Sequence, residues 1–217
     1  MYAFISYQIA DKLVAGKIKA LLQEAGIESF MAHEDVNVSE EWRLKILKEI
    51  GLADLFVSLW SKNYYDSCWC IQESGIASFR EGLTVIPLST DGSSPLGFAN
   101  NIQSTRIDPD DVQLINLMPG LVKAEPDFGI KLLFKKLEES KSFRGAEANF
   151  KEIIPYLDIF TPEQGKKLLK ISINNNQIHH ASLCASKFLP AILAKHGSSL
   201  AADEHFFLSE ILKDYAT

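Results

Sequence analysis

Hydrophobic residues follow two different spacings along the first 140 residues of the chain. Short apolar runs rich in β-branched and aromatic side chains predict buried strands. Between them, apolar residues at every third or fourth position predict amphipathic helices. The runs that predict strands are residues 2–7, 27–32, 54–60 and 83–89, with a weaker run at 104–108. This alternation is typical of an α/β fold with a parallel sheet covered by helices on both faces.

The segments with helical spacing carry signals at their ends. Gly26 and Gly82 are placed to end two of them, and Ser39 is a predicted N-cap for a helix that begins at Trp42. Right-handed crossovers bring the carboxyl ends of all parallel strands to one edge of the sheet. We therefore expect a ligand to bind among the loops at that edge. The predicted helices are 14–25, 42–50, 67–82 and 128–137.

Beyond a change of composition near residue 140, only helical spacing is found. Thr161 and Gln164 have the arrangement of a capping box, with Pro162 at the first helical position. We predict one domain over residues 1–140 and a small all-α module over residues 145–217. A module of that size has a limited core of its own, so we expect it to pack on the first domain or on another copy.

Two further helices are predicted in this module. One runs through HHASLCASKFL and is bent or stopped at Pro190, and an amphipathic helix lies around residues 207–215. His179 and His180 belong to the module, and we expect both at the surface or at an interface.

Composition and charge exclude several classes of protein. The 217 residues are 47% hydrophobic and 23% charged, as in folded soluble proteins. A net charge of −6 and the lack of a basic stripe argue against nucleic acid as a partner. Without a long apolar run or a signal peptide, we expect a cytoplasmic protein that does not contact membranes. The glycine-rich phosphate loops of dehydrogenases and NTPases do not occur.

The segment DSCWCIQESG, residues 66–75, raises the question of thiol chemistry. With Cys184, Cys68 and Cys70 make three cysteines, an odd number that does not describe a disulfide framework. A zinc site needs a compact second pair of ligands, and none is present. Free cysteine often behaves as a small hydrophobic residue, so packing is the favoured role of Cys70. We expect neither a metal nor another cofactor.

Glu73 is the strongest candidate for chemistry in this segment. On a helix, Trp69, Glu73, Ile76 and Ala77 share one face. A carboxylate beside an indole and aliphatic groups loses solvation, which raises its pKa toward neutrality and suits it to proton exchange or to binding hydroxyl groups. The pattern alone favours a blander alternative, in which Glu73 lies at the helix margin and reaches water.

Other candidates flank the expected ligand-binding edge. Ser6 and Tyr7 end the first strand there, and the alternative is that they simply begin a loop. Trp42 is either an anchor of the core or an aromatic wall for a ligand. Trp69 is favoured as a packing residue.

Four segments resemble, in order and in separation, signature segments of the TIR (Toll/interleukin-1 receptor) domain family. The resemblance covers roughly residues 1–140. It implies a flavodoxin-like fold with a five-stranded parallel sheet, and residues from about 145 have no counterpart in it. The segments are YAFISYQIADK, HEDVNVSEEW, ADLFVSLWSKNYYDSCWCIQE and LTVIPL.

The resemblance also implies an activity. Many bacterial and plant members of the family cleave NAD at the nicotinamide–ribose bond, and some cyclise the ADP-ribose product. Their key carboxylate is the glutamate of an S-x-W-C-x-x-E segment, which is Glu73 here. The resemblance therefore implies an NAD hydrolase or ADP-ribose cyclase, with NAD as substrate and Glu73 as catalytic residue. Its implied substrate-binding residues are Ser6, Tyr7, Trp42 and Trp69.

The implied setting is a bacterial protein in antiphage defence or cell-death signalling, with a separately encoded effector as partner. TIR domains of animal adaptors act instead by assembling with one another, largely through a loop that corresponds to residues 33–41. The resemblance thus leaves open a non-catalytic interaction module, or interference with the TIR signalling of a host. Under either hypothesis we expect a homo-oligomer. Tyr7-Gln8 and Ser39 depart from residues common in enzymatic relatives, which bears on rate and substrate preference.

Overall fold

The computed structural model describes residues 1–31 and 42–215, and it divides into two compact units, Met1–Pro126 and Asp127–Thr217. The predicted domains ended and began near residues 140 and 145. In the structure the helix that contains Phe134 and Leu137 groups with the C-terminal helices instead, because it packs its apolar face among them. Each unit is described separately below.

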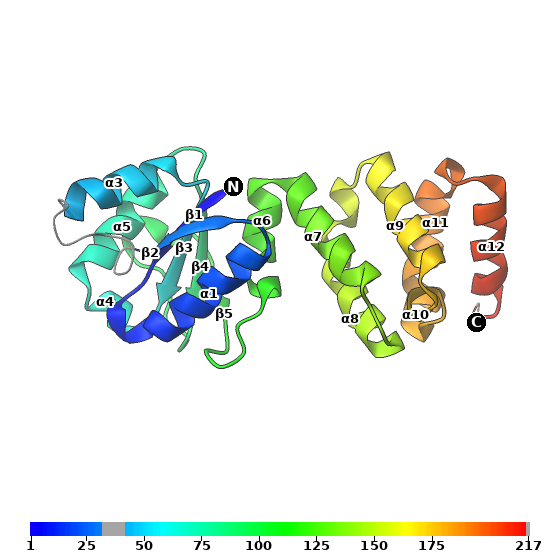
Figure 1. Cartoon of the computed structure of the whole chain (residues 1–217), viewed down its shortest axis with the longest axis horizontal. Helices are drawn as coiled ribbons and strands as arrows, with labels where there is room; N and C mark the ends of the chain where they lie inside the picture. The colour runs from blue at the N-terminus through cyan, green and yellow to red at the C-terminus, as the bar shows by residue number, and fades with distance from the viewer. Residues whose placement is uncertain (32–41, 216–217) are drawn as a thin grey trace. The chain divides into compact units, whose positions relative to one another are not determined.

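A five-stranded parallel sheet forms the centre of the first unit, in the order β2-β1-β3-β4-β5 (Figure 1). This order is that of the flavodoxin-like fold. All five predicted strands are present, and each is shorter than or equal to the run that predicted it. Their bounds are β1 Tyr2–Ser6, β2 Glu28–Met31, β3 Leu55–Trp60, β4 Thr84–Ser89 and β5 Thr105–Arg106.

One face of the sheet carries a row of aromatic rings. Phe4 pairs in register with Phe30 and with Phe56, and its ring centroid lies 5.4 Å and 5.5 Å from theirs. Helix α3 (Trp42–Leu52) covers this row with Ile46 and Ile50. Helix α5 (Cys68–Phe79) contributes Ala77 to the same cluster. The side chains that point to this face therefore join three strands and two helices in one core.

Helices also cover the opposite face of the sheet. Ile86 of β4 pairs with Val57, which alternates with Phe56, so both side chains point away from the aromatic row. Helix α6 (Met118–Ala124) approaches Ile86 through Gly120, where an added Cβ would lie 2.3 Å from the isoleucine side chain. Only glycine permits this approach. Helix α1 (Lys12–Glu24) buries Ala15, Ile18 and Leu22.

Among the described residues of this unit, two helices were not predicted. Helix α4 (Lys62–Tyr65) is too short to show a period, and α6 contains Pro119 and Gly120, which usually interrupt helices. Pro119 is tolerated because it lies in the first turn. Helix α5 ends at Phe79, before the predicted end at Gly82. Gly26 directly follows the C-cap of α1 with a left-handed φ of 80°, as predicted, whereas Gly82, with a φ of 77°, lies in the turn beyond the end of α5.

The second unit consists of helices (Figure 1). The capping box is present: Gln164 N–H donates to Thr161 Oγ1 at 3.2 Å, and Thr161 N–H donates to Gln164 Oε1 at 2.9 Å. The helices are α7 Pro126–Glu138, α8 Phe143–Ile153, α9 Pro162–Asn174, α10 Asn176–His179, α11 Leu189–His196 and α12 Ala202–Lys213. Helix α8 was not predicted, because its sequence reads as polar and rich in small residues.

Of the two alternatives predicted for Pro190, a bend or a stop, the structure excludes the stop, because the π-helical turn Cys184–Phe188 continues directly into α11. One detail of this unit differs from expectation. His179 is 5% exposed, and its Nδ1 lies 2.8 Å from the Ser172 carbonyl, so the prediction of a surface histidine was wrong for this residue. The unit has buried apolar residues of its own, including Phe150 stacked on Phe188.

Candidate active site

The strand order of the first unit defines where a ligand fits. Between β1 and β3 the chain changes the direction in which it adds strands, so the loops after these two strands diverge. In open α/β sheets, the crevice at such a switch point is the usual ligand site. Ser6 ends β1 and Trp60 ends β3, which places both at this crevice.

Helix α5 begins beside this crevice and carries Glu73 in its second turn. Ser67 is the N-cap, and its Oγ accepts a hydrogen bond from Cys70 N–H at 3.3 Å. Cys70 packs in a buried cluster with Trp60 and Tyr64. Because Glu73 lies three residues after Cys70, it is on the same buried side of the helix.

The buried face of α5 differs from the predicted one. It comprises Cys70, Glu73, Ser74 and Ala77, whereas Trp69 and Ile76 are 45% and 40% exposed. Packing of Cys70 against the end of β3 sets this rotation. The interpretation of Cys70 as a packing residue is confirmed, and the exposure of Trp69 contradicts the packing role that was favoured for it.

Glu73 is 5% exposed and is held by a hydroxyl group. Its Oε2 accepts a hydrogen bond from Ser6 Oγ at 2.6 Å. Burial raises the pKa of Glu73 from 4.5 to about 7, while the hydrogen bond from Ser6 acts in the opposite direction. The alternative that the pattern alone favoured, with Glu73 at the helix margin and in contact with water, is wrong, and the rise in pKa expected for a buried carboxyl is present.

A cavity of about 170 Å³ opens beside this carboxyl. Tyr7 and Trp42 line it together with Glu73, and the exposed Trp69 lies on its wall. Trp42 also packs on the aromatic core, so it serves both as an anchor and as a wall. The remaining lining residues are Ile5, Ser67 and Cys70.

Ser6 is not among the residues that line this cavity, because its hydroxyl is engaged with Glu73 and Tyr64. The sequence placed it at the correct edge of the sheet but predicted contact with a ligand rather than with the glutamate. Ser67 and Tyr64 were not identified. An N-cap signal before α5 could have found Ser67, whereas Tyr64 has no local signal.

The thiols show no sign of activation. Cys68, Cys70 and Cys184 are free, and burial raises the pKa of Cys70 to about 12. A thiol of such a pKa remains protonated at neutral pH and is a poor nucleophile. The chemistry of the cavity therefore rests on its carboxyl group.

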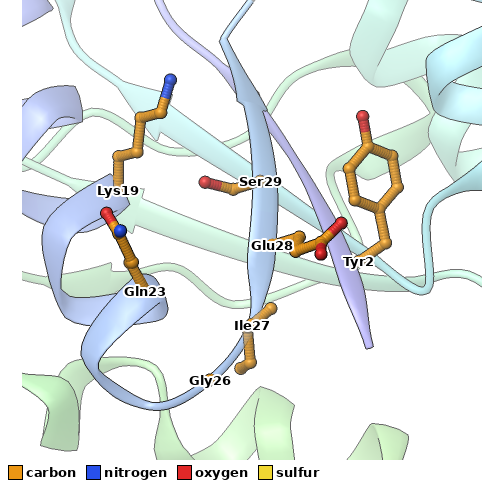
Figure 2. A pocket seen from close by; sticks show the side chains of 7 residues that line it. All are labelled: Tyr2, Lys19, Gln23, Gly26, Ile27, Glu28 and Ser29. Carbon is orange, nitrogen blue, oxygen red and sulfur yellow. The ribbon is translucent and has the colours of Figure 1, made fainter.

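A larger hollow of about 570 Å³ lies elsewhere on the first unit (Figure 2). Ser29 of β2 points toward Lys19 and Gln23 of α1, whereas Glu28 points to the other side of the strand, toward Tyr2. Tyr2 and Glu28 are the first residues of their strands, so this hollow is at the amino end of the sheet. It is separate from the crevice where parallel sheets bind ligands.

The predicted assembly loop, residues 33–41, and the predicted N-cap Ser39 lie outside the described residues. In the described part of the chain, no helix combines the length and apolar character needed to cross a membrane.

Comparison with protein families tests the resemblance to the TIR domain family. The family model of the TIR domain matches residues 3–118, more than half of the chain. The chain belongs to the TIR domain family. The match extends from β1 to the start of α6 and so contains the sheet, Glu73 and the cavity. Curated proteins provide no significant match to this TIR protein.

Proposed function

We propose that this TIR domain cleaves NAD at the bond between nicotinamide and ribose. The observation that carries the proposal is a buried carboxyl, Glu73, placed on a cavity at the switch point of the sheet. Membership of a family that includes NAD-cleaving enzymes supports the same reaction. NAD is the substrate, and the reaction as proposed needs no bound cofactor.

The chemistry suits a single carboxylate. Cleavage of an N-glycosidic bond passes through a state that resembles an oxocarbenium ion. An ionised carboxylate beside the ribose stabilises this positive charge and accepts hydrogen bonds from ribose hydroxyl groups. Nicotinamide leaves as a neutral base because its ring nitrogen is already cationic in NAD, so no general acid is required.

The cavity would hold only part of the substrate. At about 170 Å³ it is smaller than the pockets of about 300 Å³ or more that enclose drug-sized ligands. We propose that it receives the reacting end of NAD, with the indoles of Trp42 and Trp69 against the nicotinamide or ribose. Hydrolysis and cyclisation then differ in whether water or another group reaches the ribose carbon.

The test is to incubate purified protein with NAD and to identify the products by mass spectrometry, in comparison with Glu73→Ala. We expect free nicotinamide with either ADP-ribose or its cyclic form from the wild type, and none from the variant. High protein concentrations belong in the test, because TIR domains commonly assemble with one another. An assembled wild-type protein that leaves NAD intact would contradict the proposal. Equal turnover by Glu73→Ala would show that Glu73 is not catalytic.

One feature favours a second candidate function, homotypic assembly without catalysis. Ile76 and Phe79 of α5 and the neighbouring Phe98 line a shallow hollow, and the two phenylalanines are 90% and 83% exposed. Exposed apolar patches mark interaction surfaces. In this case the protein would sediment as an oligomer, Phe79→Ser would shift it to the monomer, and NAD would stay intact. Under either function we propose a role in bacterial defence or cell-death signalling, in which a separately encoded effector responds.

A further inference from the structure

Three buried groups behind the cavity form a continuous hydrogen-bonded chain. Glu73 Oε2 lies 2.6 Å from Ser6 Oγ, Ser6 Oγ lies 2.8 Å from Tyr64 Oη, and Tyr64 Oη lies 3.1 Å from the Cys70 carbonyl oxygen. Ser6 and Tyr64 are 1% and 0% exposed. The chain therefore connects the carboxyl on the cavity to a backbone carbonyl of the same helix through two hydroxyl groups.

Each hydroxyl has one proton to donate, so the direction of donation depends on the charge of Glu73. When Glu73 is ionised it only accepts, and Ser6 must donate to it. Tyr64 can then donate to Ser6. When Glu73 is protonated it can donate to Ser6, Ser6 can donate to Tyr64, and Tyr64 can donate to the Cys70 carbonyl. In both states no hydroxyl proton in the chain lacks an acceptor.

We propose that Tyr64 is a positioning residue which, acting through Ser6, keeps Glu73 hydrogen-bonded in both of its protonation states. Its importance for catalysis rests on the proposed function, since it touches neither the cavity nor the substrate. The chain lets Glu73 change its charge without leaving a buried polar group unpaired, a state that would be costly. The side chain of Glu73 then keeps one orientation on both sides of its titration.

The effect of Tyr64 on the pKa of Glu73 can be measured because the titratable groups around Glu73 are neutral. On α5 and α4 the titratable neighbours are Cys70 and Tyr64, both of which interact electrostatically with Glu73, and Tyr7 lies on the cavity wall after β1. Burial raises the pKa of both Cys70 and Tyr64, so both remain neutral at physiological pH. Among described residues, no cation contributes to the raised pKa of Glu73, which leaves the hydroxyl chain as the group that stabilises its charge.

The direct test is the pKa of Glu73, measured from its carboxyl ¹³C chemical shift in glutamate-labelled protein and assigned by the signal that Glu73→Gln removes. Ser6→Ala removes a hydrogen bond to the charged form and should raise this pKa by about one unit. Tyr64→Phe weakens the same bond by removing its cooperative donor, and should raise the pKa by roughly half a unit. An unchanged pKa in Tyr64→Phe, with only the melting temperature lowered, would show a purely structural role and overturn the proposal.

Tyr65→Phe is the matched control. Its hydroxyl donates to the Ser94 carbonyl at 2.6 Å and accepts from Ser94 N–H at 2.8 Å, outside the chain that ends at Glu73. We expect the same Glu73 pKa as in the wild type. A shift as large as that of Tyr64→Phe would contradict the proposed pathway through Ser6.

A second experiment changes the donor strength of the tyrosine hydroxyl groups and keeps every hydroxyl group in place. Replacement of the tyrosines by 3-fluorotyrosine makes each phenol a stronger donor, so the pKa of Glu73 should fall, and this fall should vanish in Tyr64→Phe protein. A fall that persists in Tyr64→Phe protein would contradict the proposal.

Neither measurement of the Glu73 pKa depends on NAD turnover. If the pKa shifts occur in a protein that leaves NAD intact, the proposed function fails and the hydroxyl chain stands. If NAD is cleaved while the pKa of Glu73 is insensitive to Tyr64, the proposed function stands and the role of the hydroxyl chain fails.

Discussion

Glu49 and Glu73 are both buried glutamates on helices that cover the same face of the sheet, yet their surroundings differ. Glu49, on α3, is 7% exposed, accepts a hydrogen bond from the Tyr2 hydroxyl and pairs with Lys45 at 3.2 Å. Glu73, on α5, is 5% exposed and accepts a hydrogen bond from the hydroxyl of Ser6, and no cation of the described part of the chain contributes to its pKa. Tyr2, the phenol partner of Glu49, lies at the amino end of the sheet, where its backbone N–H donates to the Asp54 carboxylate.

The comparison teaches that burial alone does not make a functional carboxylate. Glu49 is paired with a lysine and a phenol and does not line the cavity, as expected of a structural residue. Glu73 borders a cavity on one side, and on the other side it is hydrogen-bonded to the neutral hydroxyl of Ser6. Its carboxylate is therefore available to interact with a ligand in the cavity. The following predictions test this distinction, from the largest expected effect to the smallest.

Exchanging each carboxylate for its amide should separate the two residues by activity. Glu73→Gln should lower the rate of NAD cleavage by about a hundredfold to a thousandfold, because it removes the charge that faces the developing cation. Glu49→Gln should change the rate less than about twofold, since it lies outside the cavity. Initial rates of nicotinamide release, at equal protein concentration, are the measurement. Similar losses in both variants would break the comparison.

Titration of Glu73 should affect rate and stability in opposite directions. Cleavage needs the ionised form, so kcat/KM should rise with pH and level off above about 7. In the folded state the pKa of Glu73 is raised from 4.5 to about 7, so the native protein holds a proton that the unfolded chain releases. Stability should therefore fall as the pH rises between these values, by about 3 kcal/mol in total.

Urea unfolding at several pH values checks the stability part. Glu73→Gln carries no titrating carboxyl at this position, so it should lack this decline and exceed the wild type in stability near pH 8. Glu49→Gln provides the control, because it leaves the carboxyl of Glu73 in place and should keep the decline that Glu73 causes. A wild-type protein whose stability is flat across this interval would argue that Glu73 is not desolvated as described.

The phenol of Tyr2 should matter for stability and not for activity. Tyr2→Phe leaves buried Glu49 without one donor and should lower the free energy of unfolding by about 1–2 kcal/mol. The rate of NAD cleavage by the folded protein should be unchanged. Thermal unfolding with parallel rate measurements tests both statements, and a tenfold loss of rate would contradict the assignment of this region to structure.

The ion pair of Glu49 should have the smallest effect. Lys45 and Glu49 are four residues apart on α3, and the lysine side chain is 27% exposed. Lys45→Met should therefore cost about 0.5 kcal/mol of stability, and the difference from the wild type should shrink at high salt. Urea midpoints at low and high ionic strength measure it. A loss several times larger would mean that the cation is essential to the buried anion.

The sequence was most informative where local patterns carry the signal. Apolar runs predicted every described strand of the sheet, and the sequence pattern predicted the helix that carries Glu73. These features depend on residues that are close together in the chain. The pattern alone favoured a Glu73 in contact with water, so its burial and the resulting rise in its pKa became clear only from the structure.

Features that arise only from tertiary packing were not predictable. Ser6 meets Tyr64 and Glu73 across 58 and 67 positions of sequence, so no local pattern reports these contacts. The rotation of α5 that exposes Trp69 is set by Cys70 against the end of β3. Helix α6 was missed because the residue that usually interrupts a helix, Gly120, is the one that fits against Ile86.

The N-cap of α5 has a consequence for how this site can vary. Ser67 starts the helix, and every residue added to a helix turns the following ones by about 100° around its axis. An insertion or deletion of one residue between Ser67 and Glu73 would swing the carboxyl out of the cavity while leaving the helix intact. The length of this interval is thus under a stricter constraint than the identity of most residues within it, and natural variation of the site should proceed by substitution.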